Sequence, residues 1–257
     1  MTDLLYEVKD HIAWVTINRE RQRNAISPHA IQLFLNCLND AESDSKVRVV
    51  CLTGAGDKVF CSGADLGAAM HETPEKKAIM FGQYAQLLTR ISQFPKPTLA
   101  RINGHCLAGG TGFMLACDIV IARDDALFGT PEVNVGLFPM MIGALIFRNV
   151  LRKKAMEMVL LGEKMTAEKA LEMGMVTRIF PPGSFDQETR AILLTLAGKS
   201  PLGIKIGKQA FQEVEGMPLG LAVETLATKL EQVAATKDAA EGITAFFEKR
   251  TPNFTGE

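Results

Sequence analysis

The chain has 257 residues, of which 47% are hydrophobic and 22% are charged, and its formal net charge is −1 at pH 7. This length fits one large domain or two small ones with a sizeable core, and the near-zero charge argues against a general phosphate-binding surface and, with no basic stripe, against a nucleic-acid partner. No apolar run reaches the roughly 18 residues that a membrane-spanning helix needs. The N-terminal stretch MTDLLYEVKD carries early acidic residues and lacks the pattern of a signal peptide.

Cysteine and histidine residues are scattered along the chain. The five cysteines include no C-x-x-C pair, which indicates free thiols in a reducing compartment. The four histidines show no pairing at i and i+4, so the sequence predicts no metal site. We therefore expect a cytoplasmic protein that binds neither metal nor membrane.

Strand and helix patterns alternate through the first two thirds of the chain. One helix is predicted to begin at Ser27 and Pro28, and another at Thr73 and Pro74, because an N-cap hydroxyl followed by proline favours a helix start. Apolar, β-branched runs around these helices predict strands at 4–10, 12–18, 47–54, 97–102 and 118–122. This alternation predicts the α/β class with buried strands.

After Pro139 the chain is predicted to be almost entirely helical. Capping boxes are predicted at Ser184 with Gln187 and at Asp238 with Glu241. The predicted helices cover 144–162, 166–174, 184–199, 201–214, 219–237 and 238–250. The break into this helical tail is expected near residues 198–201.

Two glycine-containing loops, FCSGADL at 60–66 and HCLAGGTG at 105–112, are predicted to follow strands and open helices. A helix N-terminus presents free N–H groups, and small residues let a ligand oxygen approach them. Two such loops facing each other would form an oxyanion hole. Close packing of a helix on a sheet would also explain the glycines. A dinucleotide fingerprint fits poorly, because Leu115 stands where its third small residue belongs.

These segments resemble the crotonase superfamily, also called the enoyl-CoA hydratase/isomerase family. The similarity covers essentially the whole chain and includes RNAIS, FCSGADL, INGHCLAGGTGFMLACDIVIA and GEKMTAEKALEMGMVTRIF. It implies an α/β crotonase (ClpP-like) spiral of ββα turns over residues 1–198. It also implies a helical trimerisation region over residues 199–257, in a homo-trimer or hexamer. The implied substrate is an acyl-CoA thioester, with coenzyme A as part of the substrate and no separate cofactor.

The resemblance also assigns roles by position. The backbone N–H groups of Ala64 and Gly109 would hold the thioester oxygen and stabilise an enolate. The remaining matched positions would bind substrate, either along the adenine and pantetheine path or from a C-terminal helix: Ala25, Asp65, Leu66, Gly110, Phe246 and Lys249.

The number of carboxylates separates the reactions of the family. Hydratases typically use two glutamates; the second matches Glu132, whereas the first falls on Gly112. A further acidic position of some relatives falls on Met140. We expect Glu132 in an apolar pocket with Phe138, Met140 and Met141, where burial would raise its pKa. A lone carboxylate suits isomerisation of 3-enoyl-CoA to 2-enoyl-CoA.

Other readings of the same residues stay open at this stage. Glu132 could act with an unidentified second group in a hydratase, or it could merely cap a loop. The chain could also be a catalytically silent CoA-thioester binder. We expect His105 to be a packed structural side chain, and Cys61 and Cys106 to be buried bystanders of the two loops.

Overall fold

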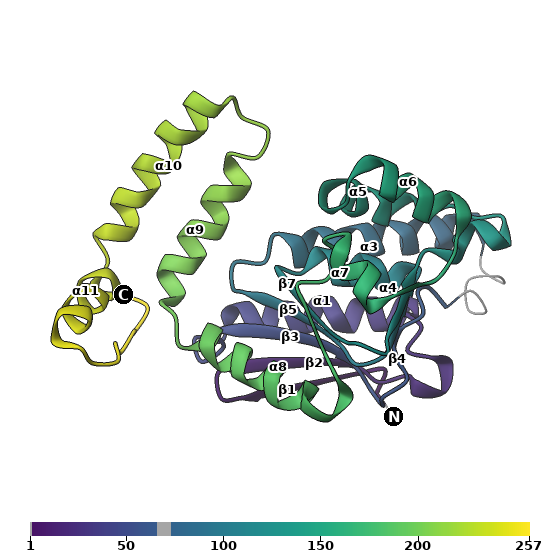
Figure 1. Cartoon of the computed structure of the whole chain (residues 1–257), viewed down its shortest axis with the longest axis horizontal. Coiled ribbons are helices and arrows are strands. Elements are labelled where there is room, and N and C mark those ends of the chain that lie inside the picture. The colour runs from purple at the N-terminus through teal and green to yellow at the C-terminus, as the bar shows by residue number, and fades with distance from the viewer. Residues whose placement is uncertain (1, 66–72) are drawn as a thin grey trace.

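The computed structural model describes residues 2–65 and 73–257, and its strands form two sheets (Figure 1). Beyond the antiparallel pair β1 and β2, the larger sheet is parallel. Its spatial order is β1 (Leu4–Lys9), β2 (Ile12–Ile17), β3 (Val49–Gly54), β5 (Thr98–Ile102), β7 (Ile119–Arg123) and β10 (Arg178–Phe180). The smaller sheet has the order β4 (Val59–Cys61), β6 (His105–Leu107), β8 (Leu127–Gly129) and β9 (Met165–Thr166).

The chain winds between the two sheets as a spiral. Each turn passes from a strand of the larger sheet to a strand of the smaller one: β3 to β4, β5 to β6, and β7 to β8. Helix α3 (Pro74–Ser92) returns the first turn and α4 (Gly109–Ala116) returns the second. This arrangement is the predicted ββα spiral, and it brings the ends of β4, β6 and β8 to one place in the molecule.

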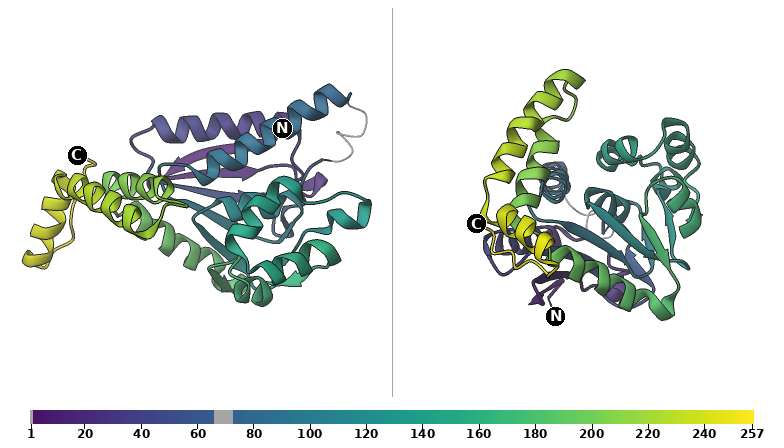
Figure 2. Two further views of the ribbon diagram at one scale, coloured as in Figure 1. Left: turned by 90° about the horizontal axis from the view of Figure 1, so that it is seen from above. Right: turned by 60° about the vertical axis from the view of Figure 1, so that its left-hand side comes forward.

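Helices cover both faces of the larger sheet (Figure 2). On one face, α1 (Pro28–Ser43), α3 and α4 share a single apolar cluster with the strands. On the other face, α8 (Pro182–Ala197) buries Phe185, Leu193 and Ala197 against β2, β3, β5 and β7. Every residue of β3 is buried, as expected for a parallel strand covered on both sides.

The helix starts predicted at Ser27 and Thr73 are confirmed, because each hydroxyl accepts a hydrogen bond from the N–H three residues later. Both predicted capping boxes are wrong. Helix α8 begins at Pro182 after Pro181, upstream of Ser184. The N-cap of α11 (Lys237–Glu248) is Thr236, which leaves Asp238 inside the first turn.

Three further differences from the predicted elements concern short segments. The strand β4 lies within a segment expected to be loop, and β8, β9 and β10 were not predicted either. Pairing with neighbouring strands, which local sequence does not encode, determines strands this short. The helix expected over 144–162 is two helices, α5 (Met140–Asn149) and α6 (Arg152–Leu161), because Val150 and Leu151 adopt extended backbone angles. The short helix α7 (Ala167–Glu172) follows β9.

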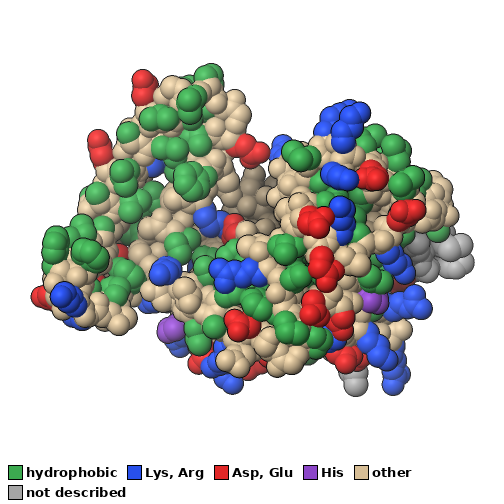
Figure 3. Space-filling view, viewed as in Figure 1, with side chains coloured by type: hydrophobic (Ala, Val, Ile, Leu, Met, Phe, Trp, Pro, Cys, Tyr) green, Lys and Arg blue, Asp and Glu red, His purple; other side chains and the backbone are tan. Residues whose placement is uncertain are grey.

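The last three helices form an arm that projects from the spiral (Figures 1 and 2). The arm consists of α9 (Pro201–Glu213), α10 (Leu219–Ala234) and α11. Helix α10 buries none of its side chains. Large apolar side chains are exposed along the arm: Phe211, Leu219, Leu221, Val223, Leu230, Ile243, Phe246 and Phe247. Figure 3 shows this apolar surface over the arm and the hollow between the arm and the rest of the molecule.

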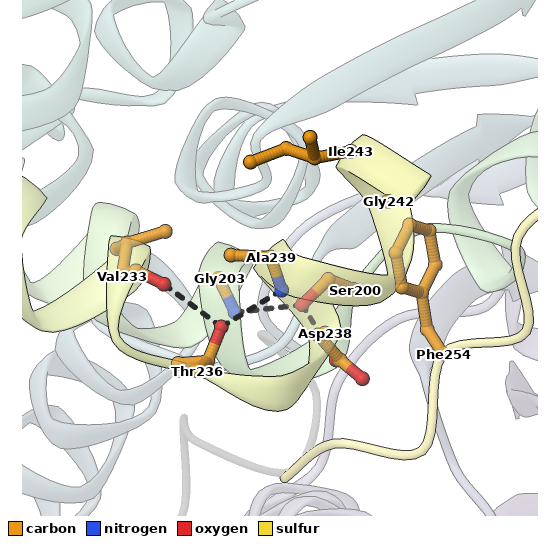
Figure 4. A pocket seen from close by; sticks show the side chains of 9 residues that line it. All are labelled: Ser200, Gly203, Val233, Thr236, Asp238, Ala239, Gly242, Ile243 and Phe254. Atoms are coloured by element: carbon orange, nitrogen blue, oxygen red, sulfur yellow. Dashed lines mark hydrogen bonds between the residues drawn. The ribbon is translucent and has the colours of Figure 1, made fainter. Parts of the chain in front are cut away.

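Asp238 is a buried carboxylate at the base of the arm, where it lines a small pocket (Figure 4). It accepts hydrogen bonds from the Ser200 hydroxyl at 2.7 Å and from the Thr255 N–H at 2.8 Å. It also accepts one from the Gly256 N–H at 3.1 Å. Asp238 therefore joins α9, α11 and the C-terminal segment.

None of the described helices is both long and apolar enough to cross a membrane.

Candidate active site

The two predicted loops lie against each other at the ends of β4 and β6. A Cβ atom built on Gly63 would lie 2.7 Å from the Cβ of Ala108 and 2.9 Å from the backbone nitrogen of Gly109. Gly63 also has a φ of +96°, which favours glycine. Only glycine therefore allows the first loop to approach the N-terminus of α4 this closely.

The backbone N–H of Ala64 points away from the neighbouring chain segment. The N–H of Ile26 donates to the carbonyl of Gly63 at 2.8 Å, and the N–H of Asp65 donates to the carbonyl of Ile26 at 3.0 Å. Because alternate groups of an extended segment face opposite sides, the N–H of Ala64, between them, faces the other way. Ala64 is exposed, so a ligand can reach this donor.

Gly109 supplies the second donor. It is the first residue of α4, so its N–H has no acceptor within the helix. The residue before it, Ala108, has φ 51° and ψ −129°, an unusual conformation for a residue with a side chain. The N–H of Ala108 donates to the carbonyl of Gly129 at 2.9 Å, which fastens this turn to the end of β8. The two adjacent loops thus carry two N–H groups that have no acceptor within the described part of the chain, a feature that an oxyanion hole would need.

Glu132 follows three residues after Gly129, in the short 3-10 helix η2 (Pro131–Val135). Its Oε2 atom is buried and has no hydrogen-bond partner in the described part of the chain. Burial raises the pKa of this carboxyl, and a backbone hydrogen bond partly opposes the shift. A buried, unpartnered carboxylate oxygen is costly, and it is poised to take or give a proton.

Sequence reasoning missed Tyr84. Its hydroxyl, projecting from α3, donates a hydrogen bond to the carbonyl of Gly109 at 2.6 Å. Burial raises its pKa well above 10, and Cys61, Glu132 and Cys106 act in the same direction. A usable signal existed: Tyr84 lies four residues after the buried Met80 and four before the buried Leu88. A hydroxyl on such a buried stripe needs a partner.

A side chain at Gly112, where a two-carboxylate site would have a glutamate, would require the surrounding side chains to shift. A Cβ on Gly112 would lie 2.4 Å from Cγ2 of Ile142 and 2.8 Å from the Tyr84 hydroxyl. It would also lie 3.2 Å from Cδ2 of Leu88. The side chains around position 112 therefore pack against a glycine, which agrees with the absence of a carboxylate there.

The predicted substrate-binding residues beside Ala64 form an ion-pair network. Arg19 bonds the carboxylate of Asp65 at 2.9 Å and pairs with Asp3 at 3.3 Å. Arg19 also donates to the carbonyl of Ala25. In this structure, Asp65 and Ala25 thus serve to fix the loop that carries Ala64, and the Asp65 side chain is engaged with Arg19.

The other predicted positions are spread over the molecule. Leu66 lies outside the described residues. Gly110 is buried in α4, where a Cβ would meet the Cys61 carbonyl oxygen at 2.5 Å. Phe138 and Met140 are exposed on the segment that leads from η2 into α5. Phe246 and Lys249 lie at the end of α11, remote from both loops of the same chain (Figure 1).

The side chains expected to be structural occupy structural positions. Nδ1 of His105 accepts a hydrogen bond from the Leu127 N–H at 3.1 Å. Cys61 and Cys106 are buried, and burial raises the pKa of the Cys61 thiol to about 12. Among the described residues, no three metal-ligating side chains gather closely enough to hold an ion.

Comparison with known proteins identifies the family of the chain. The sequence profile of the Enoyl-CoA hydratase/isomerase family matches residues 7–257. The chain is 35% identical to the 2,3-dehydroadipyl-CoA hydratase of Escherichia coli, over the full length of both proteins. It is 33% identical to the (E)-benzylidenesuccinyl-CoA hydratase of Thauera aromatica, covering 97% of this chain and 98% of that protein. The crystal structure of an enoyl-CoA hydratase from Bacillus anthracis superposes with a TM-score of 0.95, at 31% identity and complete coverage of both chains.

Proposed function

The chain belongs to the enoyl-CoA hydratase/isomerase family, and from this premise we propose that it isomerises a 3-enoyl-CoA thioester to the conjugated 2-enoyl-CoA. The observation that carries this proposal is Glu132, because burial raises its pKa and its buried Oε2 atom has no hydrogen-bond partner among the described residues. The space at Gly112, where a second carboxylate would stand, is taken by Tyr84 and Ile142. One proton carrier is sufficient for isomerisation.

The proposed reaction uses Glu132 twice. Its carboxylate removes a proton from C2 of the substrate, and the electron pair moves onto the thioester oxygen as an enolate. The N–H groups of Ala64 and Gly109 stabilise that negative charge. The enolate then collapses, the double bond moves from C3–C4 to C2–C3, and protonated Glu132 returns the proton to C4. The substrate gains and loses no atoms, and the enzyme returns to its starting state.

Hydration of a 2-enoyl-CoA is the second candidate. It is favoured by the relatives, because the proteins from Escherichia coli and Thauera aromatica are both named as hydratases of CoA thioesters. In that reaction Glu132 would activate a water that adds to C3. The hydroxyl of Tyr84 is the polar side-chain group nearest to the position of the missing glutamate. Its raised pKa keeps it protonated, so it would not act as a second base.

We further propose that a second copy of the chain covers the arm, in a homo-trimer or hexamer. The exposed apolar side chains of α9 to α11 support this, because they form an extended patch on a region with little core of its own. Phe246 and Lys249, remote from their own loops, would then bind substrate held by a neighbouring copy.

On this proposal coenzyme A is part of the substrate and no separate cofactor is needed. The unpaired thiols of all five cysteines support a cytoplasmic location.

Mass spectrometry of a 3-enoyl-CoA incubated with the protein in heavy water tests the reaction. Isomerisation predicts a conjugated product that takes up deuterium without gaining water, and a loss of turnover in Glu132→Gln. A 3-hydroxyacyl-CoA product would establish hydration instead. Binding of the thioester without any conversion, with Glu132→Gln indistinguishable from the wild type, would indicate a catalytically silent binder.

A further inference from the structure

Tyr84 is the polar side chain at the centre of the site for which the proposed reaction gives no role. It lies on α3, and its ring packs edge-on against the buried Phe113 with 5.4 Å between the ring centroids. This packing holds the ring in one position. The position of the hydroxyl at the start of α4 is therefore fixed by the packing of the ring.

The hydrogen bond of the Tyr84 hydroxyl lies next to the peptide group that carries the Gly109 N–H. The peptide unit that carries the Gly109 N–H lies between two anchors. On one side, the Ala108 N–H donates to the Gly129 carbonyl at 2.9 Å. On the other side, the Gly109 carbonyl accepts from Tyr84 at 2.6 Å. With both neighbouring peptide groups held, the direction of the Gly109 N–H between them is fixed.

The unusual backbone of Ala108 makes such anchoring necessary. A non-glycine residue at φ 51° and ψ −129° is unfavourable and persists only where the surrounding contacts enforce it. Without the Tyr84 hydroxyl, this turn keeps the Ala108 N–H bond to Gly129 and the bond from the Thr111 N–H to the Ala108 carbonyl at 2.9 Å, but it loses its anchor at the Gly109 carbonyl. The Gly109 N–H would then lose its fixed direction, and an oxyanion hole depends on donors that are already oriented before reaction.

Tyr84 also fits the glycines that face it. A Cβ at Gly109 would lie 3.0 Å from the hydroxyl oxygen, and one at Gly112 would lie 2.8 Å from it. Both distances are closer than an ordinary van der Waals contact. Tyr84, Gly109 and Gly112 are therefore matched in size, and the hydroxyl occupies space that a side chain at position 112 would otherwise fill.

We propose that Tyr84 is a positioning residue for catalysis, which orients the Gly109 N–H of the oxyanion hole through its hydrogen bond to the Gly109 carbonyl. This inference rests on the proposed function, since it assumes that Ala64 and Gly109 polarise a thioester carbonyl. The hydroxyl stays neutral and donates throughout the working pH range, because burial keeps its pKa well above 10.

The test compares Tyr84→Phe with Tyr6→Phe, and these are the two tyrosines of the chain. Both changes remove one buried hydroxyl and keep the ring. The Tyr6 hydroxyl has no hydrogen-bond partner among the described residues and belongs to β1, away from the loops. We expect Tyr84→Phe to lower kcat about tenfold, the effect of losing one useful hydrogen bond, with KM changed less than about twofold. Tyr6→Phe should leave both constants unchanged.

A spectroscopic readout separates positioning from a purely structural role. Cinnamoyl-CoA absorbs at longer wavelength when its thioester carbonyl is polarised, so its shift on binding reports the oxyanion hole directly. We expect a smaller shift in Tyr84→Phe than in the wild type and in Tyr6→Phe. If Tyr84→Phe lowers only the melting temperature and keeps both the wild-type kcat and the wild-type shift, the proposal is wrong.

Two further measurements separate a failure of the proposed function from a failure of the proposed role of Tyr84. If the wild type neither converts nor polarises any enoyl-CoA, the proposed function fails, and the inference fails with it. If the wild type is active and Tyr84→Phe does not fold, 3-fluorotyrosine incorporated at both tyrosines gives two fluorine resonances, assigned through Tyr6→Phe. Binding of cinnamoyl-CoA should then shift the Tyr84 resonance and leave that of Tyr6 in place; an unmoved Tyr84 resonance would overturn the inference.

Discussion

The spiral and the arm of this protein are stabilised in different ways. The spiral holds two apolar clusters, and no described residue beyond Ala197 belongs to either of them. The arm instead contacts the spiral through polar groups. Lys208 bonds the carboxylate of Asp118, and Gln212 donates to the Ser92 carbonyl at 3.0 Å. The spiral can therefore fold around its own core, whereas the arm exposes apolar surface that its own chain does not cover.

This difference also divides the candidate site. The oxyanion loops, Glu132 and Tyr84 all belong to the spiral, and their positions are fixed by contacts within one chain. Phe246 and Lys249 belong to the arm, and their proposed role depends on a second copy. Changes in the spiral should therefore alter chemistry, and changes in the arm should alter assembly.

The largest expected effect on the spiral side comes from Glu132→Gln. Removing the proton carrier should lower kcat by a factor of about 10² to 10⁴, measured with a 3-enoyl-CoA substrate. In the wild type, kcat/KM should fall as the pH drops through the pKa of Glu132. Because burial raises that pKa, the fall should occur at a higher pH than for an exposed glutamate. Activity of Glu132→Gln equal to that of the wild type would exclude this residue as the base.

The same variant also tests stability, with the opposite sign. A carboxyl whose pKa is raised by folding favours the folded state most below its ordinary pKa, and this contribution is lost as the pH rises through the raised pKa. At neutral pH, Glu132→Gln should therefore have a higher Tm than the wild type, by about 2–4 °C per kcal/mol gained. The difference should vanish in acid, which scanning calorimetry at several pH values can measure.

On the arm side, the double change Phe246→Asp and Phe247→Asp should disrupt assembly. Both side chains are more than three-quarters exposed in the single chain, at 78% and 77%. Buried against another copy, the new carboxylates would be desolvated at a cost that association cannot offset. Sedimentation velocity should show a trimer or hexamer for the wild type and smaller species for the variant. Leu5→Asp, an exposed position of β1, is the control, and a monomeric wild type would contradict the proposed assembly.

A smaller effect is expected at the base of the arm. Asp238→Asn keeps the size of the side chain but weakens its hydrogen bonds to the Thr255 and Gly256 N–H groups. The loss of charge-assisted bonds should cost about 1–3 kcal/mol and lower the Tm by a few degrees. The kcat of the folded enzyme should stay at the wild-type value. A strong loss of kcat with normal assembly would show that the arm and the spiral are coupled more closely than their contacts suggest.

The smallest expected effect concerns Cys61, which lies directly under the loops. Because burial raises the pKa of its thiol to about 12, almost none of it is ionised at pH 8. Iodoacetamide should leave Cys61 unmodified in the native protein and modify it after unfolding, as peptide mass spectrometry can establish. Rapid modification of the native thiol would mean that the loops open far more often than their packing implies.

Much of the fold was predictable because its signals are local. Ser27 and Thr73 start helices with their own hydroxyls, and the strand at 49–54 begins with four apolar residues in a row. The short strands β4 and β8 depend on partners far away in the sequence, so their residues alone did not reveal them. Asp238 was mistaken for an N-cap because its binding partners, at residues 200 and 255–256, are likewise distant.

The candidate site was predictable only in part, for a related reason. The resemblance gave Glu132 and the backbone donors, and it noted the missing carboxylate at Gly112. It did not supply Tyr84, because the hydrogen bond to Gly109 joins residues 25 positions apart. The open alternative, that glycines serve close packing, holds at Gly104, where a Cβ would lie 2.3 Å from the Lys58 carbonyl. Some of the glycines in this region thus serve close packing of the backbone.

Ala108 has a consequence for engineering this enzyme. A side chain in this left-handed conformation typically costs about 1–3 kcal/mol, and glycine would avoid most of that cost. Designers who seek thermostability would therefore find Ala108→Gly an attractive replacement. Yet glycine would also widen the range of conformations open to the turn next to Gly109. A chain stabilised in this way would hold the N–H of the proposed oxyanion hole less firmly, so on our proposal thermal stability and turnover would change in opposite directions at one residue.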